Sequence, residues 1–285
     1  MSLLVLVLLA LLALGTVNAF AEDDPVLEQY FVANAAYNRN LFPVAVTQFE
    51  SFLAAHADHP KADLARQGLG LSLYALKQYE KALPQFAQLL AKPALDKEID
   101  RERIIMLQGQ CLLHSSKAED ARKLFMENLE KLSKPAYKTA ALAAICDVAF
   151  GKSEWDKTIG WTEKLLATEA TPDQAARGLY QRGFAFYRTD KLAEATVVLE
   201  KLSALDAAPT WKTRAAYLQG ECHSSLGQHD KAELAFAAAL PGMTGAEAAE
   251  CQYRLGVTRF LLAKYEPAVA DFAAYVKDAK PDEKG

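Results

Sequence analysis

The chain has 285 residues, of which 51% are hydrophobic and 9% aromatic, a composition typical of folded proteins. Its formal net charge at pH 7 is −4 and its pI is about 5.8. Because nucleic-acid binding needs a cationic surface, this mildly acidic chain without basic blocks argues against a nucleic-acid partner.

The first 21 residues have the pattern of an export signal. An almost unbroken apolar run, Leu3 to Leu14, is followed by Ala19-Phe20-Ala21 and then by acidic residues. Small residues at these positions suit signal peptidase, so we expect cleavage after Ala21 and export to the periplasm or cell envelope. No Lys or Arg precedes the apolar run. This leaves open the alternative that residues 3–21 stay attached and anchor the chain in the inner membrane.

After this segment, residues 22–285 have apolar side chains three and four positions apart, the spacing of helices with one buried face. A small residue recurs every 36 to 39 residues, at Ala45, Ala82, Ala121, Thr158, Ala195, Ala232 and Ala268. So regular a period predicts a stack of helical hairpins, each packed against its neighbours. We expect seven repeats near residues 26–61, 62–100, 101–138, 139–175, 176–212, 213–248 and 249–285.

Two further positions recur with this small residue. Twelve residues earlier stand Ala33, Gly70, Gly109, Cys146, Gly183, Gly220 and Gly256. Four residues later stand Phe49, Phe86, Phe125, Thr162, Leu199, Phe236 and Phe272. Glycine inside a helix costs about 1 kcal/mol relative to alanine, so its recurrence predicts a close approach of the two helices in each hairpin.

These positions resemble the tetratricopeptide-repeat superfamily, which pairs a Leu-Gly step with a later Ala-x-x-x-Phe and a proline between repeats. The matching residues are Leu69-Gly70 with Ala82 and Phe86, Leu255-Gly256 with Ala268 and Phe272, and Pro135, Pro172 and Pro209. A period nearer 37 than about 34 residues is similar to a looser bacterial cell-envelope subgroup. That subgroup includes the outer-membrane assembly lipoprotein and the Tol-Pal-associated division coordinator. The resemblance implies an all-α, right-handed α-solenoid of about seven helix-turn-helix repeats and about fourteen antiparallel helices.

In this family the first helices of the repeats line a concave groove. The resemblance therefore implies a peptide-binding groove formed by Arg103, Gln110, His114, Phe150, Arg177, Tyr180, Phe184, Tyr187, Arg188, Arg214, Tyr217, Glu221, Tyr253 and Phe260. Arg and Tyr often dominate interface energies, and arginine can hold a carboxylate through two hydrogen bonds. We expect Arg177, Arg188 and Arg214 to bind acidic groups of an extended or helical peptide. The alternative is that the aromatic residues are only recurrent packing residues.

No catalytic or metal-binding pattern stands out. Gly151-Lys152-Ser153 looks like the end of a phosphate-binding loop, but Cys146 stands where that loop needs another glycine. The five histidines lack the paired spacing of a zinc site. We therefore expect no enzymatic activity, no metal and no cofactor.

Disulfides between first helices are doubtful, because helices lie roughly 9 Å apart and bonded cysteines need Cα atoms within about 7 Å. The pairing of Cys111, Cys146, Cys222 and Cys251 stays open.

The expected function is a non-enzymatic scaffold or adaptor of the bacterial periplasm or cell envelope that binds a protein or peptide partner. One alternative is the N-terminal part of a longer tetratricopeptide array with a regulatory or secretion role. Another is a membrane-anchored protein of the same fold. No polar capping helix follows the last repeat, and its final helix is apolar on more than one side, at Val269, Phe272, Tyr275 and Val276. Self-association through this helix is a further expectation.

Overall fold

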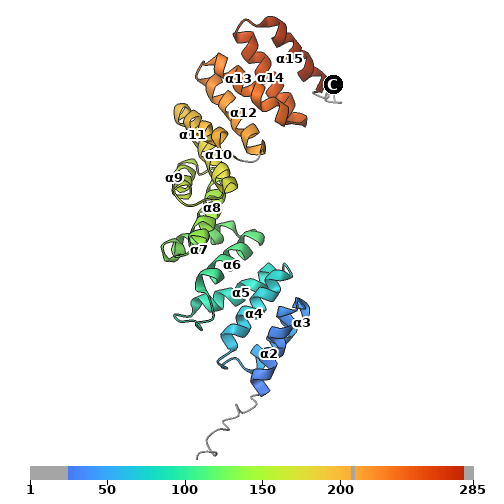
Figure 1. Cartoon of the computed structure of the whole chain (residues 1–285), viewed down its shortest axis with the longest axis vertical. Helices are drawn as coiled ribbons and strands as arrows, with labels where there is room; N and C mark the ends of the chain where they lie inside the picture. The colour runs from blue at the N-terminus through green and yellow to red at the C-terminus, as the bar shows by residue number, and fades with distance from the viewer. Residues whose placement is uncertain (1–24, 207–208, 279–285) are drawn as a thin grey trace, which may run out of the picture. The chain divides into compact units, whose positions relative to one another are not determined.

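The structure, a computed structural model, describes residues 25–206 and 209–278 (Figure 1). The expected export signal or anchor, residues 1–21, lies outside the described residues. The described part contains fourteen α-helices and two short 3₁₀-helices, and no strand. Within this part, no helix combines the length and the apolar character needed to cross a bilayer. The predicted all-α class and the predicted fourteen helices are therefore confirmed.

The chain divides into two compact units, residues 1–117 and 118–285. The described helices of the first unit are α2 (Pro25–Asn38), α3 (Phe42–Ala55), α4 (Ala62–Ala75), α5 (Tyr79–Ala91) and α6 (Arg101–His114). Those of the second are α7 (Ala118–Asn128), α8 (Pro135–Gly151), α9 (Trp155–Leu166), α10 (Pro172–Arg188), α11 (Leu192–Ala204), α12 (Pro209–Ser225), α13 (His229–Ala239), α14 (Gly245–Leu261) and α15 (Tyr265–Asp278). The 3₁₀-helices η1 (Leu129–Lys131) and η2 (Leu240–Gly242) follow α7 and α13.

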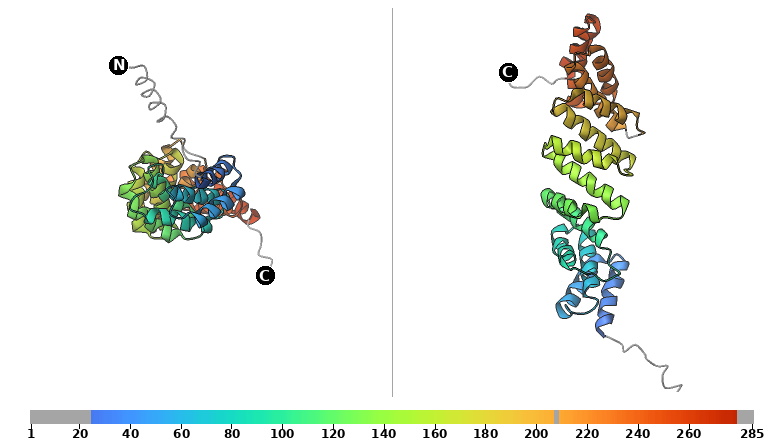
Figure 2. Two further views of the ribbon diagram at one scale, coloured as in Figure 1. Left: turned by 90° about the horizontal axis from the view of Figure 1, so that it is seen from below. Right: turned by 90° about the vertical axis from the view of Figure 1, so that its left-hand side faces the viewer.

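Within each unit, consecutive helices pack against each other, as Figure 2 shows. Short turns join the two helices of each hairpin, and such turns make neighbouring helices antiparallel. In the second unit, α8, α10, α12 and α14 are the first helices of successive hairpins, and α9, α11, α13 and α15 are the second helices. Contacts of α10 with α8 and with α12 bring successive first helices together. Residues on these helices can therefore form one surface.

The predicted close approach inside the hairpins is confirmed. All seven recurring small residues of the second helices are buried, with at most 1% of their surface exposed. A Cβ atom added to Gly70 would lie 2.6 Å from the ring of Phe86, and one added to Gly183 would lie 2.8 Å from Leu199. Real side chains do not approach so closely, so the absence of a side chain in the first helix makes room for the residue that fills the hairpin.

Every hairpin turn contains one residue with a left-handed backbone, five positions before the small residue. These residues are Asn40, Lys77, Ser116, Ser153, Asp190, Gly227 and Ala263, with φ between 58° and 69°. The next backbone N–H in each turn donates to a carbonyl five residues earlier, as Gln78 does to Leu73 at 2.9 Å. This hydrogen bond closes the end of the first helix and directs the chain into the second.

The later repeat boundaries differ from those expected. The first helices α8, α10, α12 and α14 begin at residues 135, 172, 209 and 245, each four residues before the predicted starts at 139, 176, 213 and 249. The prolines expected between repeats are instead the first residues of α8, α10 and α12. Proline suits this position because its missing N–H would have no partner in the first turn of a helix.

Candidate functional site

Two adjoining depressions lie on the first helices of the second unit. The smaller has a volume of about 240 Å³ and is lined by Asp147, Phe150, Arg177, Tyr180, Gln181, Trp211 and Arg214. The larger has a volume of about 500 Å³ and is lined by Tyr180, Arg214, Tyr217, Met243, Ala246, Glu247 and Glu250. Because Tyr180 and Arg214 line both, the depressions form one continuous surface over α8, α10, α12 and α14. We call this the first-helix surface.

An aromatic cluster borders the smaller depression, with Phe184 of α10 at its centre. The Phe184 ring centroid lies 5.4 Å from that of Phe150 and 5.6 Å from that of Trp155. On α10 itself, the rings of Tyr180 and Tyr187 lie 6.2 Å and 6.4 Å from it. Positions 180, 184 and 187 are three and four residues apart, so they share one face of the helix. Packing of the rings on each other limits their motion and gives the surface a rigid apolar area.

The tryptophan of α12 extends this cluster toward the larger depression. The Trp211 ring lies 5.8 Å from Tyr180, and its indole N–H donates to Asp173 at 2.7 Å. Both partners belong to α10, so these contacts join two successive repeats. They also fix the orientation of the ring that the guanidinium of Arg214 covers.

The three arginines expected to bind acidic groups differ in their partners. Arg177 is already paired, because its Nη1 lies 2.8 Å from a carboxylate oxygen of Asp147. The guanidinium of Arg188 lies over the ring of Trp155 at 5.0 Å, and that of Arg214 over the ring of Trp211 at 5.4 Å. Neither of these two forms an ion pair with any residue that the structure describes. A guanidinium stacked on a ring keeps its N–H groups available for a carboxylate.

Two partly buried carboxylates complete the electrostatics. Burial raises the pKa of Asp147, although the Gln181 amide, which donates to it at 2.7 Å, and the charge of Arg177 act in the opposite direction. Burial also raises the pKa of Glu221, opposed mainly by Arg254, whose Nε lies 3.4 Å from the carboxylate. These two carboxylates already interact with neighbouring side chains. The guanidinium groups of Arg188 and Arg214 are therefore the charged groups of this surface whose N–H donors remain available.

A scan against protein-family models finds no match, and a search of curated proteins finds none either. Solved structures do match. The C-terminal part of a TPR repeat-containing protein from Cytophaga hutchinsonii aligns with a TM-score of 0.65 at 14% identity, covering 90% of this chain and 97% of that one. YrrB, described as a TPR protein with an unusual peptide-binding site, aligns with a TM-score of 0.53 at 20% identity, covering 72% and 93%.

A third structure, residues 41 to the end of MamA from Desulfovibrio magneticus RS-1, aligns with a TM-score of 0.53 at 16% identity, covering 65% of this chain and 98% of that one. This chain has the tetratricopeptide-repeat fold. The resemblance read from the Leu-Gly and Ala-x-x-x-Phe positions is thereby confirmed. At such low identities the likeness establishes the fold, and the site has to be argued from its own residues.

Nine of the fourteen candidate groove residues of this tetratricopeptide fold lie at or beside the first-helix surface. They come from α8, α10 and α12, and they are Phe150, Arg177, Tyr180, Phe184, Tyr187, Arg188, Arg214, Tyr217 and Glu221. Tyr217 also packs on Phe236 at 5.7 Å, and burial raises its pKa to about 12. Some aromatic residues therefore both line the surface and pack the repeat.

The other five candidates lie elsewhere. Arg103, Gln110 and His114 belong to α6 in the first unit, where Gln110 accepts a hydrogen bond from Tyr74 at 2.8 Å. His114 stacks on Tyr79 with ring centroids 4.4 Å apart. In the last hairpin, the candidates Tyr253 and Phe260 pack against α15, on Tyr275 and Tyr265 respectively. Both lie outside the two depressions.

Sequence reasoning missed both tryptophans of the surface, Trp155 and Trp211. A signal for Trp155 was present, because an aromatic residue stands three positions before the small residue in other repeats too, as Phe42, Tyr79 and Tyr265 do. It also missed Gln181, which is only 5% exposed and whose Oε1 has no hydrogen-bond donor among the described residues. A signal for Gln181 was also present, because apolar residues, Ala144 and Leu218, stand at the equivalent positions 37 residues before and after it.

The described residues contain no cluster of three or more His, Cys, Asp or Glu side chains able to hold a metal ion. All four cysteines are free thiols in the interior. Cys146 replaces the recurring glycine of the first helix, and burial raises the pKa of its thiol to about 12. A buried neutral thiol behaves as a small apolar residue, so these cysteines contribute packing.

Proposed function

We propose that this tetratricopeptide chain is a non-enzymatic scaffold that binds a peptide or protein segment on the first-helix surface of its second unit. The observation that carries the proposal is the pair Arg188 and Arg214. Each is held on a tryptophan ring without an acidic partner in the described part of the chain, beside depressions lined by Tyr180 and Tyr217. Arginine, tryptophan and tyrosine are the residue types that most often dominate binding energy at interfaces.

The chemistry of the surface favours a segment with an acidic part and an apolar anchor. Carboxylates of the segment would take the free N–H groups of Arg188 and Arg214, and an apolar side chain would enter the larger depression next to Tyr217. On the α14 side, Glu247 and Glu250 line the same depression, so a basic group suits that end. Depressions of this shape receive individual side chains, whereas a small-molecule site encloses most of its ligand.

The peptide-binding site in the description of YrrB supports the proposal as a property of a protein with the same fold. The non-enzymatic part of the proposal has a test of its own. An activity that disappears on mutation of Asp147 or Glu221, with the helical fold intact, would contradict that part.

The test is affinity capture with the full chain and with an Arg188→Ala, Arg214→Ala variant, followed by quantitative mass spectrometry. We expect partners held by the parent chain to fall by about tenfold or more in the variant, since charge-assisted contacts at an interface centre are worth 2 kcal/mol or so each. The control is Arg39→Ala, which removes an exposed arginine from the turn after α2. Equal capture by all three chains would place binding elsewhere.

We also propose that the chain is exported to the bacterial periplasm or cell envelope. The apolar run Leu3 to Leu14 and the sequence Ala19-Phe20-Ala21 support this. Mass spectrometry of the chain recovered from periplasmic and membrane fractions is the test. A soluble periplasmic chain that begins at Glu22 is the expected result. An intact chain in the membrane fraction would favour the anchored alternative, and an intact chain in the cytoplasm would contradict both.

A further inference from the structure

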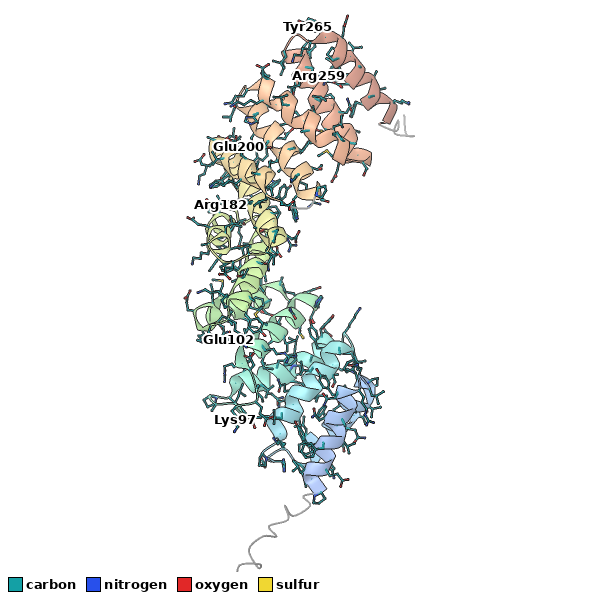
Figure 3. The ribbon with its side chains drawn as sticks, viewed as in Figure 1. Lys97, Glu102, Arg182, Glu200, Arg259 and Tyr265 are labelled. Carbon is teal, nitrogen blue, oxygen red and sulfur yellow. The ribbon has the colours of Figure 1, made fainter. Side chains whose placement is uncertain are left out.

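A second surface lies on the opposite face of α10. It is an apolar furrow of about 720 Å³ with walls from α9 and α11, and α10 forms its floor. The floor residues Leu179, Arg182 and Phe186 are three and four positions apart and share one helix face. Arg177, Tyr180 and Arg188 face the other way, because helical residues two or five apart do not share a side. Figure 3 labels Arg182 beside α9.

The packing of the helices within a repeat does not require the apolar lining of this furrow. The next repeat lies 37 residues later and packs its helices in the same manner, α12 against α13 as α10 against α11. At the positions of Leu179, Phe186 and Val198 it carries Ala216, His223 and Ala235, respectively. Leu166 likewise corresponds to Ser203. The same architecture thus accepts small or polar residues here, so the apolar furrow between α9 and α11 is an added feature.

The rim of the furrow carries charged side chains that have no partner of opposite charge among the described residues. Glu194 and Lys201 lie seven residues apart on α11, about 10.5 Å along its axis, with the 52% exposed Val197 between them. Neither charge forms an ion pair within residues 25–206 and 209–278. On the floor, the Nε–H group of Arg182 is buried without an acceptor in that same part of the chain. Its Nη2 reaches Glu163 at 3.5 Å, a long contact for an ion pair.

We propose that the furrow binds an amphipathic α-helix of a partner protein, one whose apolar stripe carries a basic and an acidic side chain about two turns apart. The basic group pairs with Glu194, and the acidic group pairs with Lys201. The third charged side chain of the lining is Arg182, on the floor. The lining offers only these three charged side chains as polar partners. An extended peptide would leave its backbone N–H and C=O groups unpaired against such a lining, whereas a helix satisfies its own.

This surface is independent of the first-helix surface, so the two could be occupied together. The probe is a fluorescently labelled synthetic helix of about 15 residues with leucines at i, i+3, i+4 and i+7 and one Lys and one Glu flanking that stripe. Binding to the full chain is followed by fluorescence anisotropy. We expect saturable binding that Val197→Asp weakens by about tenfold or more, because the carboxylate would be desolvated against the leucines.

The matched control is Leu234→Asp, the equivalent position one repeat later, which is 72% exposed and outside the furrow. It should bind the probe as the parent chain does. Lys201→Glu should shift the preference by about two- to fivefold toward a probe with two lysines, as exposed ion pairs contribute modestly. Circular dichroism checks that each variant is folded. Absence of saturable binding, equal loss in both aspartate variants, or an unchanged charge preference would overturn the proposal.

Discussion

The ring of Phe236 fills the space that a side chain at Gly220 would need: a Cβ atom on residue 220 would lie 2.5 Å from Cε1 of the ring. The two residues stand on α12 and α13, the helices of one hairpin. The same relationship holds between Gly256 and Phe272, at 2.9 Å. A recurring glycine therefore indicates that a large residue of the neighbouring helix packs against it. Replacing the glycine should separate the two helices.

Gly220→Ala should destabilise the protein by about 1–3 kcal/mol, because the methyl group forces the Phe236 ring out of its position. Urea denaturation followed by circular dichroism measures the effect. The control is Gly160→Ala in α9, where an added Cβ atom meets nothing within 4 Å. That variant should gain about 0.5–1 kcal/mol, since alanine favours a helix more than glycine does. Changes of the same sign in both variants would contradict this account.

The hairpin turns provide a second pair of substitutions. Ala263 adopts a φ of 60°, a conformation that strains any residue with a Cβ atom, so Ala263→Gly should stabilise the protein by up to about 1 kcal/mol. Gly227 adopts a φ of 69° in the equivalent turn, and Gly227→Ala should destabilise by about 1 kcal/mol. Differential scanning calorimetry measures both. A gain in the second variant would show that the turn relaxes to another conformation.

A buried ion pair joins α14 to α15. Asp271 is only 4% exposed, and its two carboxylate oxygens accept hydrogen bonds from Nη1 of Arg259 at 3.0 and 2.9 Å. Figure 3 labels Arg259. Arg259→Ala should destabilise by about 3 kcal/mol, because it leaves a buried charge whose remaining donor is the amide of Gln252. Arg259→Met combined with Asp271→Leu should cost much less. Equal losses in the two variants, measured by urea denaturation, would argue against desolvation of Asp271 as the cause.

The pH dependence of stability should carry a contribution from Glu233. It accepts hydrogen bonds from Lys264 at 2.5 Å and from Arg259 at 3.0 Å, and these contacts lower its pKa below the ordinary value of 4.5. A lowered folded-state pKa stabilises the protein above the unfolded pKa, and the contribution disappears as the pH falls through the folded pKa. Glu233→Gln should therefore lower Tm at about pH 7, and this loss should shrink as the pH falls below 4.5 and through the folded-state pKa. A Tm difference that persists in acid would have another origin.

The thiols should be inert in the folded protein. Cys111, Cys146, Cys222 and Cys251 are each 0% exposed, and burial raises their pKa values to about 11 or 12. Alkylation needs the thiolate, so at about pH 8 iodoacetamide should label none of them in the native state. All four should react in guanidinium chloride, and mass spectrometry counts the labels. Rapid native labelling of Cys222 would indicate local opening of α12.

The sequence by itself determined the hairpin repeat and the all-α class. These depend on pairs such as Gly220 and Phe236, which lie sixteen residues apart within one hairpin and recur with its period. Short-range pairs of this kind are visible as a pattern along the chain. Most of the turn conformations could not be predicted from the sequence, because six of the seven residues with a left-handed backbone in the hairpin turns are not glycine. The geometry of two packed helices imposes that conformation on whichever residue stands there.

Only the tertiary structure decided which groups of the site are free. Arg177 and Arg214 occupy equivalent positions 37 residues apart, yet Arg177 is paired with Asp147 while Arg214 rests on Trp211. The furrow beside Val197 likewise depends on side chains from three helices. Such contacts join different repeats. The sequence period identifies which residues are equivalent in these repeats, but it does not identify the residue that each one contacts. Which side chains are paired and which are exposed depends on how the repeats pack against each other. That packing results from many weak contacts, and they cannot be predicted from any single position in the sequence.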